Sequence, residues 1–310
     1  MFGTLIPVLA CILIAFSIGS NDTSNAFGIC VGAGIITFRR AVYLLGILVF
    51  LGALIQGRNV MRTVGRELVA INLRILFVSL LISAFVIILA NWKRLPVSSH
   101  QAIIGSLVGS GLAFGSTVRI DTLVRIVESW MISPVSSLIL AMIVYKAMEN
   151  LFRRLPVFKV ERLLRYLLLM NGIIIAYNTG ANELATALGP IVCYGILSSL
   201  QAVALGTLML WLGALVLSER VVETVGKGIT SLDAFSGFSA QFSAGISVFI
   251  FTMLGMPVST TYCIIGGIMG VGLLKGVETV RMSLLKRIMT SWVATPLLTF
   301  SICYIIAKII

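Results

Sequence analysis

The sequence predicts an all-α integral membrane protein made of two inverted-topology repeats, with broken helices and re-entrant helical hairpins. The chain has 310 residues, of which 59% are hydrophobic and only 11% are charged. Soluble domains contain about 45–50% apolar and 25% charged residues. Apolar runs such as 75–92 and 236–256 recur from end to end, at lengths that suit helices crossing a bilayer. The third observation is an internal repeat, which many membrane proteins carry.

The repeat has a constant offset of 161 residues. Segments 96–112 and 257–273 are identical at nine of 17 positions, and several of these are Pro, Ser or Gly, so a shared apolar bias does not explain the match. We therefore predict a first transmembrane repeat over 1–145, a linker over 146–165 and a second transmembrane repeat over 166–310.

Each half is predicted to contain the same elements in the same order. An apolar helix enters an acidic motif, and a second helix, an amphipathic connection, a third helix, a Pro-Val-Ser segment and a closing helix follow. The connection 58–74 carries four Arg and one Glu, whereas its counterpart 219–233 carries two basic and three acidic residues. Opposite charge in equivalent loops favours opposite sides of the membrane. Arg39, Arg40 and Arg58 weaken this argument, because they flank one helix and cannot all be cytoplasmic if that helix spans.

Basic residues are concentrated between the apolar runs. The linker has six basic and two acidic residues, which predicts a cytoplasmic loop. The net charge of +12 would suggest nucleic acid as the partner of a soluble protein, but here we expect these residues to contact membrane lipid instead. The five cysteines form no C-x-x-C pair and His100 is the only histidine, so neither a disulfide framework nor haem or zinc is indicated. No cofactor is expected.

Two isolated acids occupy matching positions in the repeat. Asp22 is the only charged residue between Met1 and Phe38, and its equivalent Glu183 is the only one between Tyr166 and Ser218. A charged side chain inside a membrane costs roughly 2.5–3.5 kcal/mol on insertion scales, so it is expected to face a partner, an ion or a wet cavity. The alternative is a structural acid paired with an Arg from another helix.

The residues around the acids are rich in side-chain oxygens. Na⁺ binds oxygen ligands, and the carbonyls of broken helices supply further ones. A cation at this place would also reduce the repulsion between the acids and an anion. The candidate sodium ligands are Asn21, Asp22, Asn25, Asn182, Glu183 and Thr186.

The two Pro-Val-Ser segments predict re-entrant hairpins. Each follows a long apolar run and precedes a glycine-spaced stretch of about 15 residues, too short to cross a bilayer of about 30 Å. We expect the proline in the first turn of a short helix, whose free N–H groups and hydroxyls can bind an oxyanion. Ordinary helix capping is the alternative. The candidate anion ligands are Ser98, Ser99, Gln101, Ser259, Thr260, Thr261 and Asn25.

The motifs Gly-Ser-Asn-Asp-Thr-Ser-Asn-Ala-Phe-Gly (19–28) and Gly-Ala-Asn-Glu-Leu-Ala-Thr-Ala-Leu-Gly-Pro (180–190), with both Pro-Val-Ser hairpins, resemble the inorganic phosphate transporter (PiT) family of cation-coupled symporters over essentially the whole chain. The resemblance implies a compact prokaryotic cell-membrane protein that imports phosphate with Na⁺ by alternating access. It also implies two inverted halves, both termini outside and a phosphate site between the halves. Asp22, Asn25, Asn182 and Glu183 would then lie at the ion and phosphate site, and Ser98, Ser99, Ser259 and Thr260 at the hairpin tips. We expect a carrier this small to be able to form a homodimer.

The chain also departs from the family pattern. The second motif reads Asn182-Glu183, where Asn-Asp is common, and has Thr186 where Asn is usual. Its hairpins lack the frequent Ser-Thr-Thr-His, which favours Na⁺ over a proton. Because the chain departs from the family pattern, a proton-coupled phosphate symporter or a sulfate symporter stays an alternative. A passive channel is a further one, but it needs a continuous polar stripe, whereas the polar residues here form four short segments. No H-E-x-x-H occurs, and we do not expect an enzyme.

Overall fold

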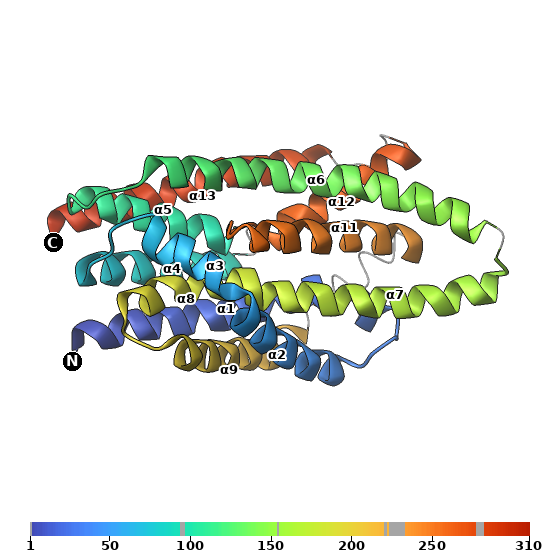
Figure 1. The fold of residues 1–310 in the computed structure, drawn as a ribbon, viewed down its shortest axis with the longest axis horizontal. Coiled ribbons are helices and arrows are strands. Elements are labelled where there is room, and N and C mark those ends of the chain that lie inside the picture. The colour runs from blue at the N-terminus through green and yellow to red at the C-terminus, as the bar shows by residue number, and fades with distance from the viewer. Residues whose placement is uncertain (1, 94–96, 154, 220–221, 223–232, 277–281) are drawn as a thin grey trace.

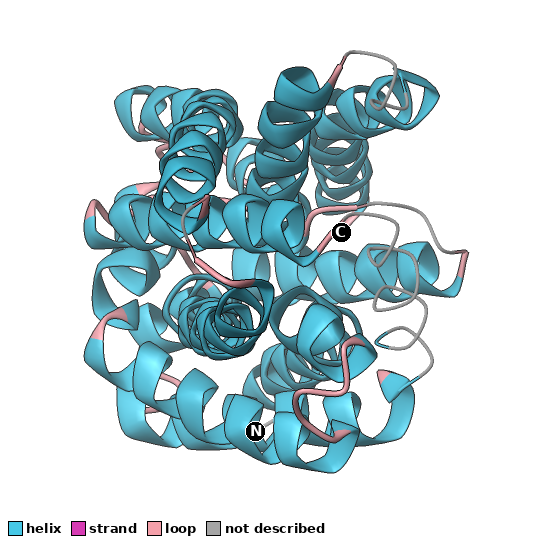
Figure 2. Cartoon of the chain, turned by 90° about the vertical axis from the view of Figure 1, so that its right-hand side faces the viewer, coloured by secondary structure: helices cyan, strands magenta, loops and turns pink. Residues whose placement is uncertain are grey.

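Helices form nearly all of the chain that the structure describes (Figures 1 and 2). The structure is a computed structural model, and it describes residues 2–93, 97–153, 155–219, 222, 233–276 and 282–310. The helices are α1 (Phe2–Gly32), α2 (Phe38–Ile55), α3 (Gly57–Arg62), η1 (Thr63–Glu67), α4 (Leu73–Trp92), α5 (Ser99–Ala113), α6 (Ile120–Phe152), α7 (Val157–Asn178), η2 (Thr179–Leu184), α8 (Ala185–Tyr194), α9 (Ser199–Leu217), α11 (Ala234–Met253), α12 (Thr260–Lys275) and α13 (Met282–Ile309).

Seven of the described helices are long and apolar enough to cross a membrane, namely α1, α2, α4, α6, α9, α11 and α13. In the same described residues, the β-structure is limited to one isolated bridge between Val69 and Val118. The predicted all-α membrane fold is therefore confirmed.

The sequence repeat reappears in the helix boundaries. Helices α4 and α11 begin 161 residues apart, as do α2 and α9, and α5 and α12. Helix α1 corresponds to the continuous run of α7, η2 and α8, and α6 corresponds to α13. In Figure 1, α1 and α6 run from left to right, whereas α7 and α13 run from right to left, so both termini lie at the left end. Equivalent helices thus run in opposite directions, as an inverted repeat requires.

Two helical hairpins enter from opposite ends of the molecule (Figure 1). The first is α4 with α5, and the second is α11 with α12. Helix α5 has 15 residues and is about 22 Å long at 1.5 Å per residue, so it is too short to cross a bilayer of about 30 Å and begins inside the protein. Each short arm packs against the closing helix of the other half, α5 on α13 and α12 on α6.

The start of the short hairpin helices differs from the prediction. Helix α12 begins at Thr260 with Ser259 as its N-cap, so Pro257 precedes the helix instead of lying in its first turn. The Pro257 carbonyl accepts a hydrogen bond of 2.8 Å from the Trp130 indole of α6, which fixes the proline in the loop. The equivalent Pro96 lies outside the described residues, but α5 likewise has Ser98 as its N-cap.

The acidic motifs differ from each other in backbone structure. Helix α1 is regular α-helix at Asp22, whereas the first part of the second motif, with Glu183, lies in the π-helical segment η2 and the rest lies in α8. The interruption of the helix at an acidic motif is therefore a single widened turn in the second half. Most of the connection 219–233 lies outside the described residues. Within the predicted linker, α6 continues to Phe152 and α7 starts at Val157.

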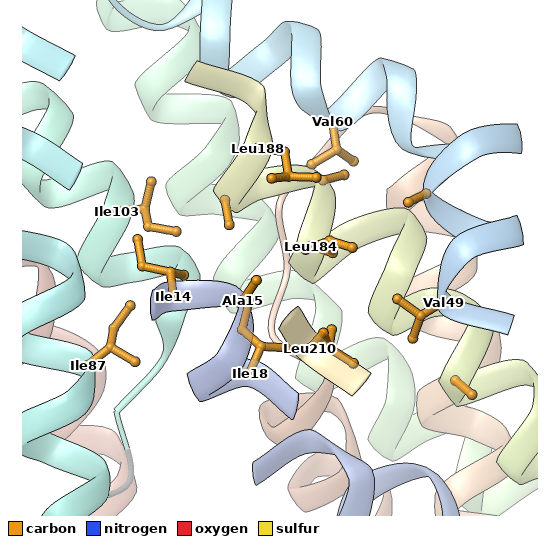
Figure 3. Close-up of a cluster of buried hydrophobic side chains, with 14 of the residues drawn as sticks. Ile14, Ala15, Ile18, Val49, Val60, Ile87, Ile103, Leu184, Leu188 and Leu210 are labelled. Carbon is orange, nitrogen blue, oxygen red and sulfur yellow. The ribbon is translucent and has the colours of Figure 1, made fainter. Parts of the chain in front are cut away.

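Glycines allow the two halves to cross closely. A side chain at Gly180 would overlap the Val49 carbonyl of α2, and a side chain at Gly19 would overlap the Leu210 carbonyl of α9. These two contacts are equivalent under the repeat. Figure 3 shows apolar side chains such as Ile18 and Leu184 filling the space around the crossings, and both are buried.

We predict that Gly180→Ala lowers the unfolding temperature more than Gly206→Ala does. The added methyl group at Gly180 meets backbone, which cannot move aside, and overpacking of this kind costs about 1–3 kcal/mol. At Gly206 the nearest atoms belong to flexible leucine side chains. Thermal unfolding of both variants in detergent gives the comparison, and equal unfolding temperatures would contradict it.

Candidate cation and anion site

The two isolated acids meet at the centre of the protein. The side chains of Asp22 and Glu183 lie within hydrogen-bonding reach of each other. Glu183 is 4% exposed and Asp22 is half-buried. Two carboxylates this close repel each other strongly when both are ionised, so the pair is stable with a shared proton or a bound cation between its oxygens.

The hairpin tips meet in the same region. Tyr262 of α12 donates a hydrogen bond of 3.2 Å from its hydroxyl to Oε1 of Gln101 on α5. Gln101 and Tyr262 are equivalent in the repeat, as Asp22 and Glu183 are. A residue can contact its own equivalent only near the axis that relates the two halves, so both contacts place the site on that axis.

Asn25 connects the first acid to the second hairpin. Its Nδ2 donates to Oδ1 of Asp22 at 2.8 Å and to the Thr261 hydroxyl at 3.0 Å. Its backbone carbonyl accepts a bond of 2.7 Å from Gln241 of α11. The side chain of Asn25 therefore joins the carboxylate to the start of α12.

Asn182 holds the loop at the tip of the second hairpin. Its Nδ2 donates to the Thr252 hydroxyl at 2.7 Å and to the Met256 carbonyl at 3.0 Å. Its Oδ1 accepts from the Val258 amide at 3.1 Å and lies 2.8 Å from Nε2 of His100. Because the Met256 carbonyl can only accept, the amide orientation is defined, and Nε2 of His100 carries the proton. Asn182 thus binds both hairpins at once.

Each hairpin presents an unpaired hydroxyl at a helix N-terminus. Oγ of Ser98 and Oγ1 of Thr260 are buried and have no hydrogen-bond partner among the described residues. Ser259 differs, because its hydroxyl accepts a bond of 3.4 Å from the Tyr262 amide. The first N–H groups of a helix and its positive dipole end attract anions. The two helix starts can therefore hold an oxyanion beside the acids.

The chain matches the sequence model of the phosphate transporter family over residues 18–303. The chain belongs to the phosphate transporter family. It is 37% identical to a protein of Methanocaldococcus jannaschii named "Putative phosphate permease", over 96% of this chain and 94% of that one. It is 28% identical to a sulfate permease of Bacillus subtilis, over 98% of this chain and 87% of that one.

One solved structure is also similar to this family member. It is named "The sodium-dependent phosphate transporter", is 26% identical in sequence and superposes with a TM-score of 0.85. The similarity covers 100% of both chains. The resemblance inferred from the motifs is therefore confirmed at the level of family and of fold.

The remaining predicted ligands lie beside the site residues described above. Asn21 and Ser99 are half-buried and adjoin Asp22 and Ser98 along the chain. The Thr186 hydroxyl donates to the Asn182 carbonyl at 2.8 Å, within its own helix, so only its oxygen lone pairs are available to a ligand.

Four side chains at the site were not among the predicted ligands, and one of them, Tyr262, donates to Gln101. Thr252 and His100 bind Asn182, and Gln241 binds the α1 backbone at Asn25 and Ala26, one helical turn after Asp22. One signal could have revealed Gln241, which is a lone amide in the apolar helix α11. His100 and Thr252 could not be assigned, because their partner lies on a different helix.

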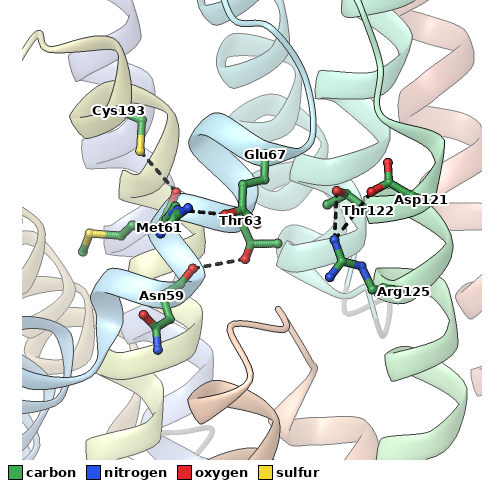
Figure 4. A network of polar contacts seen from close by, with 9 residues as sticks. Asn59, Met61, Thr63, Glu67, Asp121, Thr122, Arg125 and Cys193 are labelled. Atoms are coloured by element: carbon green, nitrogen blue, oxygen red, sulfur yellow. Dashed lines mark hydrogen bonds and ion pairs between the residues drawn. The ribbon is translucent and has the colours of Figure 1, made fainter.

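Polar contacts also support the second hairpin from outside. Asn59 of α3 donates to the Met253 carbonyl at 3.2 Å, and Thr63 donates to the Asn59 carbonyl at 3.1 Å. Figure 4 shows the bond between Asn59 and Thr63, with Glu67 nearby. Nε of Arg62 lies 2.8 Å from Oε1 of Glu67. Arg62 is largely exposed and Glu67 is half-buried, so this pair contributes little to stability.

We predict that Asn182→Ala destabilises the protein by about 2–4 kcal/mol, because it removes four polar contacts with the two hairpins and leaves the buried Val258 amide and His100 ring without this partner. Asn72→Ala is a suitable control, since Asn72 only caps α4 and its loss costs about 1 kcal/mol. Thermal unfolding of the two purified variants measures the difference. A smaller effect for Asn182 than for Asn72 would contradict its central position.

Proposed function

We propose that this protein imports inorganic phosphate together with Na⁺ by alternating access of its two halves. Membership of the phosphate transporter family supports phosphate transport, and the sodium dependence of the similar solved transporter favours sodium as the coupling ion. The contact between Asp22 and Glu183, beside two helix N-termini, is the observation that carries the proposal.

Coupling between the two solutes follows from electrostatics. Two unit charges 4 Å apart interact with about 4 kcal/mol at an effective dielectric constant of 20. An anion at the hairpin tips is therefore repelled strongly by an ionised acid pair. A cation bound between the acids lowers their net negative charge and weakens this repulsion, so phosphate binds better after the cation than before it. Empty protein and fully loaded protein are then the states that can change conformation.

The proposed ligands are the residues that the sequence analysis predicts. The cation lies between Asp22 and Glu183, and oxygens of Asn21, Asn25, Asn182 and Thr186 complete its surroundings. Phosphate lies at the hairpin tips. Its proposed ligands are Ser98, Ser99, Gln101, Ser259, Thr260, Thr261 and Asn25.

The inverted arrangement provides a route to alternating access. The hairpins come from opposite ends of the molecule and meet at the site (Figure 1), so moving one half against the other exposes the site to either end in turn. We place the linker end in the cytoplasm because of its six basic residues, and both termini outside. A homodimer in the cell membrane stays part of the proposal.

Sulfate is the second candidate substrate. The sulfate permease of Bacillus subtilis aligns with 98% of this chain, and sulfate has the same tetrahedral shape as phosphate. A proton is the second candidate for the coupling ion, since two adjacent carboxyls can also share one proton. The transport assay must therefore compare both anions and both ions.

We predict that proteoliposomes with an inward Na⁺ gradient accumulate radiolabelled phosphate above equilibrium, and that excess sulfate does not displace it. Asp22→Asn should abolish accumulation while the protein still folds, because the cation loses a charged ligand. Gel filtration and thermal unfolding verify folding. Uptake driven by a pH gradient alone, or displaced by sulfate, would overturn the ion or the substrate, and normal uptake by Asp22→Asn would remove this acid from the mechanism.

We further predict that Ser98→Ala and Thr260→Val raise the half-saturating phosphate concentration by roughly tenfold, the value of one lost hydrogen bond to a charged ligand. The half-saturating Na⁺ concentration should change much less. Ser110→Ala is the matched control, because this hydroxyl donates to its own helix at 2.7 Å. A larger effect on Na⁺ than on phosphate would reassign the hairpin hydroxyls to the cation.

A further inference from the structure

Tyr262 is the side chain through which the second hairpin reaches the first. Its hydroxyl donates to Oε1 of Gln101 at 3.2 Å, and both residues lie in the first turn of a short hairpin helix. Tyr262 is 3% exposed and Gln101 is 2% exposed, so solvent does not compete for this bond. A hydrogen bond in such a low-dielectric interior is strong and orients both of its partners.

Two residues of α13 hold the Tyr262 side chain in place. The ring of Trp292 lies 4.8 Å from the ring of Tyr262, measured between the centroids. The Ser291 side chain is hydrogen-bonded to the Tyr262 hydroxyl. A tyrosine hydroxyl has a single hydrogen, which here goes to Gln101, so Ser291 is the donor in this second bond. The hydrogen of Tyr262 is therefore committed to Gln101 and is not available to an anion.

The bond to Tyr262 determines which atoms Gln101 can offer to an anion. Oε1 accepts from Tyr262, and this is the one side-chain hydrogen bond of Gln101 among the described residues. Nε2 therefore keeps both of its hydrogens for donation. A reversed amide would present Oε1 to the ligand, and this oxygen repels an oxyanion. Tyr262 thus selects the orientation of Gln101 that suits an anion.

Other free donors lie close to this amide on the two helix starts. Ser98 caps α5 one helical turn before Gln101, and Thr260 begins α12 two residues before Tyr262. Within the described part of the chain, Oγ of Ser98 and Oγ1 of Thr260 are buried without a partner. Unpaired buried hydroxyls are rare in folded proteins, so both indicate a ligand. Nε2 of Gln101 adds a third donor at the same place.

The repeat shows that the support of Tyr262 is built for one hairpin only. Trp130 of α6 stands at the position equivalent to Ser291, and its indole donates to the Pro257 carbonyl instead. Met131, the equivalent of Trp292, is 65% exposed. These two residues of α6 do not hold the first hairpin as their equivalents in α13 hold the second. The fold therefore does not require this support, and a functional reason for it is indicated.

We propose that Tyr262 is a positioning residue for the anion, which holds the Gln101 amide so that its N–H groups face an oxyanion between the hairpin starts. This inference rests on the proposed phosphate site and adds a residue that acts through one of its ligands. Because Tyr262 and Gln101 come from opposite halves, the amide is oriented only while the two hairpin starts touch. Moving one half against the other withdraws the tyrosine, so the amide is no longer held toward the anion. Phosphate affinity is thereby highest when the hairpins meet and falls as the site opens.

The test removes the hydroxyl, the amide, or both. Tyr262→Phe keeps the ring beside Trp292, Gln101→Leu removes the amide, and the double variant combines the two changes. Tyr145→Phe is the matched control, because its ring contacts Phe235 at the start of α11, at the other end of that helix from the hairpin tip. Uptake of radiolabelled phosphate into proteoliposomes at saturating Na⁺ gives the half-saturating phosphate concentration and the maximal rate. The unfolding temperature in detergent gives the stability.

We expect Tyr262→Phe to raise the half-saturating phosphate concentration roughly tenfold, the value of one hydrogen bond to a charged ligand, and to keep the maximal rate. Tyr145→Phe should match the wild type. In the Gln101→Leu background, Tyr262→Phe should have no further effect on phosphate, because the hydroxyl acts through the amide.

Two results would overturn the inference. If Tyr262→Phe unfolds earlier but keeps the wild-type half-saturating concentration, the hydroxyl only joins the hairpins. If the double variant binds phosphate more weakly than Gln101→Leu alone, the hydroxyl contacts the anion itself. Should Tyr262→Phe fail to fold, Ser291→Ala loosens the same hydroxyl and should raise the half-saturating concentration by a smaller factor, and an unchanged value in that variant contradicts the inference.

Wild-type uptake separates this inference from the proposed function. If the wild type takes up phosphate and Tyr262→Phe matches it at every concentration, only the role of Tyr262 is wrong. If the wild type takes up no phosphate, the proposed function and the role of Tyr262 both fail.

Discussion

The contact between Asp22 and Glu183 is the constraint on which the centre of the protein depends. Two carboxyls in a membrane interior are tolerated only when their charge is compensated. Their neighbours are arranged accordingly: Asn25 donates to one acid, and η2 opens the helix that carries the other. The hairpins end at this place instead of crossing it. The architecture thus delivers helix N-termini, hydroxyls and acids to one point.

Close helix crossing makes that arrangement possible. Gly19 and Gly180 remove the side chains that would separate α1 from α9 and η2 from α2. Long helices can then pass near the axis while the hairpins fill the space from each end. Asn182 adds the polar contacts that connect the two hairpins, because it binds His100 of one and the tip loop of the other. Packing and polar bonding therefore position the same few residues.

Much of the fold and of the candidate site could be predicted from the sequence, because repeats and isolated charges are visible without coordinates. The offset of 161 residues predicted which helices are equivalent, and the short glycine-spaced runs predicted the hairpins. Contacts across the axis could not be predicted. The bond between Gln101 and Tyr262 depends on how far each hairpin reaches, and the position of Pro257 depends on the Trp130 indole. Such details are set by tertiary packing, which a local pattern does not contain.

The contacts on the axis also bear on how the two halves can differ. In a dimer of identical halves, a residue on the axis meets its own copy, so one substitution changes both partners together. Joining the halves in a single chain removes that restriction. Asp22 can then face a glutamate and Gln101 can face a tyrosine, each pair combining two chemistries that symmetry would forbid. A fused duplication therefore allows the two ends of the protein to differ in chemistry, where a symmetric dimer would make them alike.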